Sequence, residues 1–214
     1  MKLVLFDIDG TLLWTDGAGR RAIQRALVDE AGTAGPIDRY RFDGKTDPQI
    51  VRDLLSLAGH SGAENATVIQ AVCRRYVEHL RTELERPTQT TRLMVGIADL
   101  LAALEPHEAR GRALVGLLTG NVAPGAALKL RSGGLDPARF RVGAYGSDSA
   151  RRADLPMRRR YGSLSSRQTL YPSLAGGGVM NRSEILQFER REASAARSGS
   201  WTPTSSRWRT VFST

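Results

Sequence analysis

The 214-residue chain is long enough for one globular domain with a sizeable insertion, and 41% of its residues are hydrophobic. The chain has a single cysteine, Cys73, which excludes an internal disulfide and favours a reducing compartment. It has no apolar run of membrane-spanning length and no secretory signal, so we expect a cytoplasmic protein with no membrane partner. Most of the net charge of +9 lies in residues 157–214, which hold ten arginines and three glutamates, so a nucleic-acid partner is expected only for that basic tail.

The predicted elements begin with residues 2–8 (KLVLFDI), a nearly continuous apolar run rich in β-forming residues. Such a run is typical of a strand buried on both faces in a parallel sheet, and it is too short for a helix. From residue 17 to about residue 86 the apolar positions recur every 3.6 residues in three segments. This periodicity predicts a block of helices.

After Pro87 helices and strands alternate. We expect a helix over 96–104, a strand over 113–121 that ends in a turn, a helix over 124–136 closed by glycines, and a strand over 139–146. This order predicts an α/β fold with a doubly wound parallel sheet and an inserted α-helical cap. The expected parts are an α/β core at residues 1–15 and 88–156, the cap at 16–87, and an irregular, poorly ordered Arg/Ser-rich tail at 157–214.

Two carboxylates, Asp7 and Asp9, close the first predicted strand. Alternate side chains of a strand share a face, so both should point into the crevice where α/β sheets bind ligands. Neighbouring carboxylates repel each other unless a cation lies between them, and their hard oxygen atoms suit Mg²⁺. Gly10 permits a sharp turn and Thr11 can cap the next segment. The alternative is an ordinary Asp-Gly turn at a strand end.

The run DIDGTL, at residues 7–12, resembles the first motif of the haloacid dehalogenase superfamily, a large group of aspartate-nucleophile phosphatases and their relatives. The resemblance implies a Rossmann-like core and a Mg²⁺ cofactor. It also implies that Asp7 attacks phosphorus to form an aspartyl-phosphate and that Asp9 acts as acid and base. An aspartate at the second position favours a phosphatase, because the dehalogenase branch lacks this acid/base residue.

A second segment, LLTGN at residues 117–121, resembles the second motif of that superfamily and follows the first after an insertion of the expected length. A strand that ends in Thr119 and Gly120 places a hydroxyl and backbone N–H groups at the sheet edge, where they suit a phosphoryl oxygen. Strand-Thr-Gly turns also occur without function. We expect Gly120 and Asn121, together with the Gly10–Thr11 turn, to bind the substrate.

The superfamily further implies a basic residue that offsets the charge of the nucleophile and the phosphate. Lys129 lies in the helix that follows Thr119, and Arg152 lies where phosphoglycolate phosphatase-like members carry a lysine-proline pair. Either residue could instead be a surface charge, and the sequence does not choose between them.

The segment FDGKTDPQIV, at residues 42–51, resembles a GxTD loop of phosphoglycolate phosphatase-like caps, which closes over the active site. Gly44 would allow close approach to a substrate, and Lys45 would meet an anionic group. For Thr46 and Asp47 the alternative is that they simply cap the next helix.

No acidic fourth motif follows the third predicted strand, because the last aspartates are Asp148 and Asp154. Asp148 is the candidate for a third metal ligand beside Asp7 and Asp9, although both late aspartates also suit loop and helix-cap positions. In the superfamily the missing strand pairs with the first one, so its loss would leave residues 2–8 as an unpaired edge. With a weaker metal site we expect little or no turnover.

The resemblance implies hydrolysis of a small phosphorylated metabolite, in the manner of phosphoglycolate phosphatases. The alternatives are a β-phosphoglucomutase-like phosphotransferase and an inactive binding or regulatory protein. For the tail we weigh a reading-frame shift in a GC-rich gene against a nucleic-acid-binding segment. The sequence indicates neither the particular substrate nor the oligomeric state.

Overall fold

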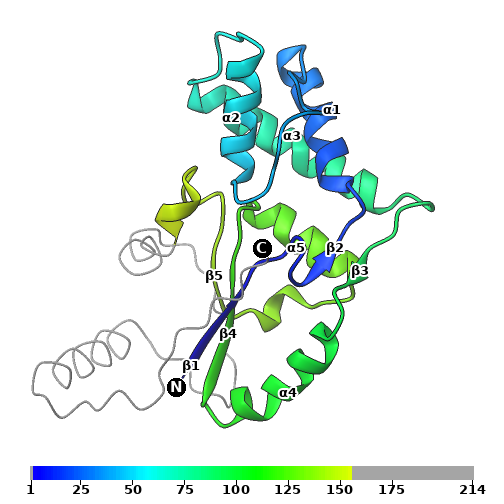
Figure 1. Cartoon of the computed structure of the whole chain (residues 1–214), viewed down its shortest axis with the longest axis vertical. Helices are drawn as coiled ribbons and strands as arrows, with labels where there is room; N and C mark the ends of the chain where they lie inside the picture. Colours follow the sequence, from blue (N-terminus) through cyan, green and yellow to red (C-terminus); the bar gives the residue numbers. More distant parts are fainter. Residues whose placement is uncertain (1, 156–214) are drawn as a thin grey trace, which may run out of the picture. The chain divides into compact units, whose positions relative to one another are not determined.

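A computed structural model describes residues 2–155, and the interpretations placed on residues 157–214 lie outside that range. In Figure 1 the chain forms two strands and a block of three helices before helices and strands alternate. This order confirms the α/β fold with an inserted helical block. The elements are β1 (Lys2–Phe6), β2 (Leu13–Trp14), α1 (Ala18–Ala31), α2 (Asp47–Leu57), α3 (Ala66–Leu84), β3 (Arg92–Leu93), α4 (Ile97–Ala109), β4 (Ala113–Leu118), α5 (Ala123–Ser132), the 3₁₀ turn η1 (Pro137–Arg139), β5 (Val142–Ala144) and the 3₁₀ turn η2 (Arg152–Asp154).

Within the described residues, strands β1, β4 and β5 form a parallel sheet in the order β1-β4-β5. Val4 is paired with Val115, and Gly116 with Val142. Because the strands are parallel, their carboxyl ends meet at one edge, which is the usual ligand-binding edge of an α/β sheet. In this described sheet β1 is an edge strand, the position that the sequence predicts for it.

The strands are shorter than predicted, and β1 is less buried. The carbonyl of Ile8 accepts the N–H groups of Thr11, Leu12 and Leu13 at 3.2, 2.9 and 3.1 Å, so the chain turns there and β1 ends at Phe6. Of its five residues only Phe6 is fully buried, which corrects the expectation of a strand covered on both faces.

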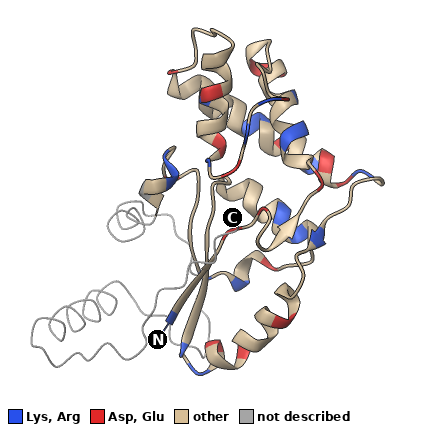
Figure 2. Ribbon diagram, in the orientation of Figure 1, with Lys and Arg blue, Asp and Glu red and all other residues tan. Residues whose placement is uncertain are grey.

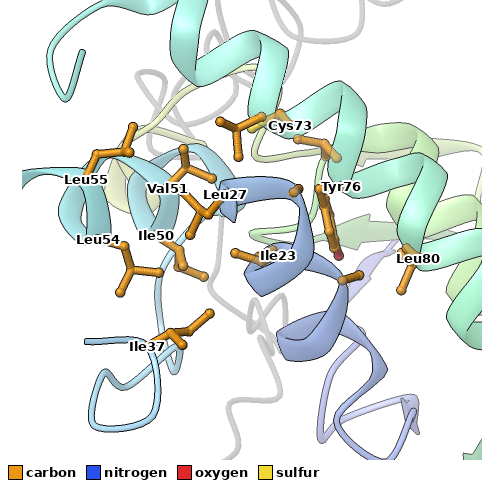
Figure 3. Close-up of a cluster of buried hydrophobic side chains, with 14 of the residues drawn as sticks. Ile23, Leu27, Ile37, Ile50, Val51, Leu54, Leu55, Cys73, Tyr76 and Leu80 are labelled. Atoms are coloured by element: carbon orange, nitrogen blue, oxygen red, sulfur yellow. The ribbon is translucent and has the colours of Figure 1, made fainter. Parts of the chain in front are cut away.

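The three inserted helices bury one common cluster of apolar side chains (Figure 3). Each helix contributes residues at the 3.6-residue spacing seen in the sequence, and Ile37 joins them from the loop between α1 and α2. The chain enters and leaves this block through β2 and β3, which pair antiparallel with Leu13 opposite Leu93. The shared cluster includes Ala22, Ile23, Ala26, Leu27, Ile50, Val51, Leu54, Leu55, Val72, Tyr76 and Leu80.

A second apolar cluster lies around the sheet and contains side chains from β1, β4, α4 and α5. Phe6 meets Phe140 edge to face, with 6.5 Å between ring centroids. The expected division into a core and a cap, with boundaries at 15/16 and 87/88, stays a prediction, and Val122 of the expected core belongs to the first cluster.

Helix α4 runs five residues beyond the predicted end at Leu104, through Pro106 to Ala109. A proline inside a helix removes one backbone hydrogen bond. Arg139, in η1, binds this last part of the helix. Its guanidinium lies 2.9 Å from Glu105 and 3.1 Å from Glu108, and it also donates to the carbonyl of Leu101. Tertiary contacts therefore offset the local cost of the proline.

Basic and acidic residues are interspersed along the described helices (Figure 2). The carboxylate of Glu83, only 1% exposed, is paired with Arg21 at 2.8 Å, Arg86 at 3.1 Å and Arg25 at 3.3 Å. Burial alone would raise the pKa of Glu83, but the hydrogen bond from Arg21 and the charge of Arg86 bring it below its usual value. Within residues 2–155, no helix has both the length and the apolar character that crossing a membrane requires.

Candidate active site

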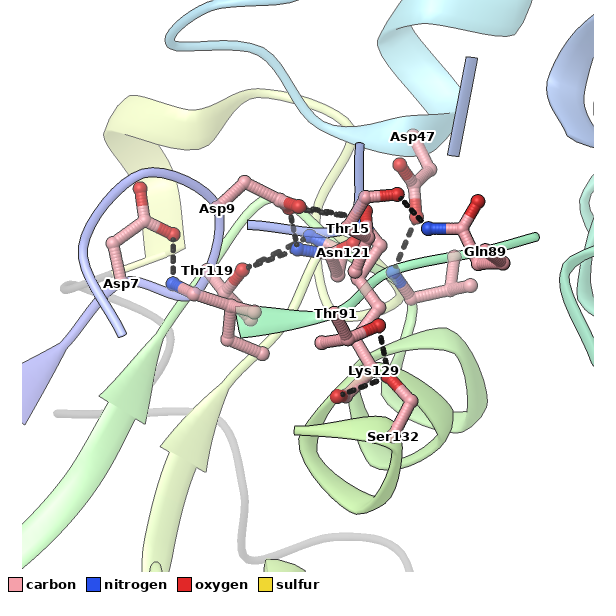
Figure 4. A network of polar contacts seen from close by, with 12 residues as sticks. Asp7, Asp9, Thr15, Asp47, Gln89, Thr91, Thr119, Asn121, Lys129 and Ser132 are labelled. Carbon is pink, nitrogen blue, oxygen red and sulfur yellow. Dashed lines mark hydrogen bonds and ion pairs between the residues drawn. The ribbon is translucent and has the colours of Figure 1, made fainter. Parts of the chain in front are cut away.

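Asp7 and Asp9 follow β1, and Thr119 follows β4, so all three lie at the carboxyl edge of the sheet (Figure 4). Gly10 has a left-handed backbone, with φ of 74°, and the turn continues through the buried Thr11 into β2. The next element after Thr11 is the strand β2 and not a helix. Thr11 is therefore a turn residue, whereas the sequence suggested that it caps the next segment. The structure thus brings the two predicted motifs together.

Asp9 is held by two side chains from the segment after β4. Lys129 Nζ donates to both carboxylate oxygens at 2.8 Å, and Asn121 Nδ2 donates to one of them at 2.7 Å. The Lys129 side chain is 6% exposed whereas that of Asp9 is 40% exposed, so the ammonium is the buried member of the pair. A buried ammonium requires such a partner, because an unpaired buried charge is strongly unfavourable.

Asn121 also fixes the hydroxyl of Thr119. The same Nδ2 donates to Thr119 Oγ1 at 2.8 Å, and the Asn121 backbone N–H does so at 3.3 Å. The Thr119 backbone N–H donates to the carbonyl of Ala144 on β5, at 3.0 Å. Thr119 is fully buried, and its hydroxyl is fixed by the same Asn121 amide that holds Asp9.

Asp7 is paired with the second candidate basic residue. The guanidinium of Arg152, in η2, donates to Asp7 Oδ2, and the N–H of Ile8 donates to Asp7 Oδ1 at 2.8 Å. The sequence left Lys129 and Arg152 as alternatives. The structure brings both to the site and gives each its own carboxylate.

The cap loop before α2 approaches this site with its backbone. Gly44 is exposed and left-handed, with φ of 71°, and Lys45 Nζ lies over the ring of Tyr40, 3.8 Å from the centroid. Thr46 caps α2 by accepting the Gln49 N–H at 3.2 Å. Lys45 therefore has an aromatic partner within the loop, and its role as a substrate contact stays a prediction.

Asp47, the first residue of α2, is buried beside the site. Its Oδ2 accepts the backbone N–H of Val122 at 2.8 Å. Burial raises the pKa of Asp47 to about 6; the Lys129 charge and the Val122 N–H counteract this, and the Asp9 charge adds to it.

Burial also raises the pKa of the Cys73 thiol, to about 12, which indicates an unreactive structural cysteine.

Solved structures with this architecture are known. CbbY from Rhodobacter sphaeroides, in a complex with phosphate, is 21% identical with a TM-score of 0.52, covering 75% of this chain and 72% of that one. A hydrolase from Pseudomonas syringae is 17% identical with a TM-score of 0.53, covering 70% of this chain and 63% of that one. Neither the models of protein families nor the sequences of curated proteins give a match. The chain has the haloacid dehalogenase fold.

Asp7 and Asp9 stay the predicted ligands of Mg²⁺, and two carboxylates are a donor set that this ion accepts together with waters and substrate phosphate oxygens. Their chemistry fits the ion, although Arg152 and Lys129 compete for the same oxygens. The third predicted ligand lies elsewhere: Asp148 is exposed and accepts the Tyr145 N–H at 2.8 Å. No group of three His, Cys, Asp or Glu residues among those described could hold a metal.

Two features of this candidate site were not predicted from the sequence. One is the contact of Asp47 with Val122, since a helix-start aspartate is usually a local cap. The other is a pair of buried polar atoms, Tyr76 Oη and Asn121 Oδ1, that take no hydrogen bond within the structure described. No periodicity or motif marks either feature, because both depend on contacts between distant segments.

Proposed function

We propose that this chain hydrolyses a small phosphomonoester through an aspartyl-phosphate formed at Asp7, with Mg²⁺ as cofactor. The observation that carries the proposal is the meeting of Asp7, Asp9 and Thr119 with two basic side chains at the carboxyl edge of the sheet. Phosphate bound to CbbY, which shares the fold, supports a phosphorylated ligand.

In the first step an Asp7 oxygen attacks phosphorus and the bond to the ester oxygen breaks, while Asp9 in its protonated form gives that oxygen its proton and becomes a carboxylate. In the second step Asp9 takes a proton from water, whose oxygen attacks the aspartyl-phosphate and releases Asp7 and phosphate. Lys129 and Asn121 orient Asp9, and Arg152 offsets charge on the transferred group. The Thr119 hydroxyl would bind a phosphoryl oxygen.

Asp7 and Asp9 would hold Mg²⁺, which when bound neutralises charge on the phosphoryl oxygens. Since Asp148 does not join them among the described residues, we expect weak metal binding and slow turnover.

The test is release of p-nitrophenol from p-nitrophenyl phosphate under single-turnover conditions, with excess protein, in Mg²⁺ and in EDTA. We expect slow release that requires Mg²⁺ and is abolished by Asp7→Asn. Equal release by wild type and Asp7→Asn, or none from wild type, would refute the proposal. A panel of phosphorylated sugars and glycolate esters, assayed in the same way, would then define the substrate.

A further inference from the structure

The start of α2 is bound to two loops of the sheet domain. The Thr46 hydroxyl donates to the carbonyl of Ala150 at 2.6 Å. Asp47 makes a reciprocal pair of contacts, since its backbone N–H donates to the Gly120 carbonyl and its side chain accepts the Val122 N–H, both at 2.8 Å. The inserted helix therefore begins directly on the loop that carries Thr119.

These segments pack so closely that they leave no room for a side chain. A Cβ atom on Gly120 would lie 2.0 Å from the Lys45 carbonyl oxygen. A Cβ atom on Gly146 would lie 2.1 Å from the Gly120 carbonyl oxygen and 3.2 Å from Thr46 Cβ. We call residues 45–47, 119–122 and 146–150 the cap joint. Within the cap joint, backbone atoms of the different segments are in direct contact.

Helix α5 depends on this joint for its N-terminus. Val122 is its N-cap residue and supplies no side-chain cap. The acceptors come from elsewhere, since Asp47 accepts the Val122 N–H and Ser147 Oγ accepts the Ala123 N–H at 3.2 Å. A carboxylate near a helix N-terminus is also favoured by the helix dipole, and Asp47 lies at the N-termini of both α2 and α5. Asp47 thus supplies, from another helix, an acceptor for the N–H of the N-cap residue of α5.

The inserted helices also close over Lys129. A Cβ atom on Gly19, in α1, would lie 3.3 Å from Lys129 Nζ and 3.8 Å from Tyr76 Oη of α3. The ammonium that holds Asp9 is therefore enclosed by the inserted helices, in agreement with its low exposure.

We propose that Asp47 is a positioning residue of the phosphate site, and this rests on the proposed function. Its carboxylate fixes the backbone of residues 119–122, so that the Thr119 hydroxyl is held in place from the inserted helix. Asp47 acts by accepting a hydrogen bond, and the negative charge itself is not required.

The experiment compares D47A, D47N and D43A in the full-length protein. Asp43 is the matched control, an aspartate of the same loop whose side chain is 84% exposed. Amide hydrogen exchange at Val122 and calorimetric binding of inorganic phosphate with Mg²⁺ are measured for each variant, and thermal unfolding confirms that each is folded. We expect D47A to exchange at Val122 at least tenfold faster and to bind phosphate about tenfold more weakly. D47N, whose amide oxygen can accept the same hydrogen bond, should stay within threefold of wild type, as should D43A.

Unchanged exchange and phosphate binding in D47A would overturn the proposal. So would a D47N variant as impaired as D47A, because the acceptor would then not be what holds the loop. If wild type neither binds phosphate nor releases p-nitrophenol, the proposed function fails, while exchange at Val122 still decides whether Asp47 fixes this loop.

Discussion

Lys129 Nζ lies 2.8 Å from both carboxylate oxygens of Asp9, although 120 positions separate the two residues in the chain. Arg152 makes the corresponding contact with Asp7. Each carboxylate of the proposed site thus has its own cation, and we propose separate roles for the two basic residues: Lys129 would orient the proposed acid/base, and Arg152 lies at the proposed nucleophile.

Lys129→Ala and Arg152→Ala should each slow single-turnover release of p-nitrophenol, by about 100-fold, since each removes a contact that orients a reacting group. The matched control is Arg110→Ala, which removes an exposed charge at the end of α4 and should release p-nitrophenol at the wild-type rate. Wild-type rates in both site variants would rule out these roles.

Gly120→Ala should impair the protein because its methyl group would lie 2.0 Å from the Lys45 carbonyl oxygen. We expect the free energy of unfolding to fall by about 2 kcal/mol, as is typical of overpacking. Gly125→Ala is the control, since its methyl group would make only ordinary contacts and alanine favours a helix. Urea denaturation of both variants would measure this difference, and equal midpoints would contradict it.

Asp47→Asn should change how stability depends on pH. The pKa of Asp47 is about 6 in the folded protein and 3.8 without burial, so the folded state binds the proton more tightly. The stability that this proton contributes is fully present below about pH 3.8 and is lost as the pH rises through about 6. Asp47→Asn should therefore gain stability relative to wild type between pH 4 and 7, on the order of 3 kcal/mol. Urea midpoints at four pH values test this, and a constant difference would count against it.

Tyr76→Phe should leave the protein as stable as wild type or about 1 kcal/mol more stable. The Tyr76 hydroxyl is buried and takes no hydrogen bond within the described residues, so its removal relieves a desolvation cost. Burial of the same hydroxyl raises the pKa of Tyr76 well above its usual value. A loss of more than 1 kcal/mol in urea denaturation would show that the hydroxyl has a partner.

The sequence was informative where a signal is local. Apolar spacing predicted α1, α2 and α3, and short apolar runs predicted β1 and β4, because burial patterns repeat with the geometry of each element. The predicted ends of the strands were less accurate, because the end of β1 depends on the hydrogen bonds that the Ile8 carbonyl accepts from residues 11 to 13. The continuation of α4 past Pro106 was missed, because it depends on Arg139.

For the site, the resemblance of the two motifs to those of a known superfamily predicted Asp7, Asp9 and Thr119. The structure places all three at one edge of the sheet. It did not show which carboxylate each basic residue contacts, or that Asp47 reaches Val122, 75 positions away. Such pairings form only when distant segments pack, and no single-sequence pattern encodes them.

The short ribbon of β2 and β3 has a consequence for how such a protein diversifies. Trp14 is paired with Arg92, so the chain departs and returns at adjacent strands, about 5 Å apart. A segment whose two ends are neighbours can be exchanged for one of another length while the ends stay where they are. The 77 intervening residues can therefore change in length and sequence as a cassette, provided that the new segment keeps the contacts that residues 45–47 make with the loop of Thr119.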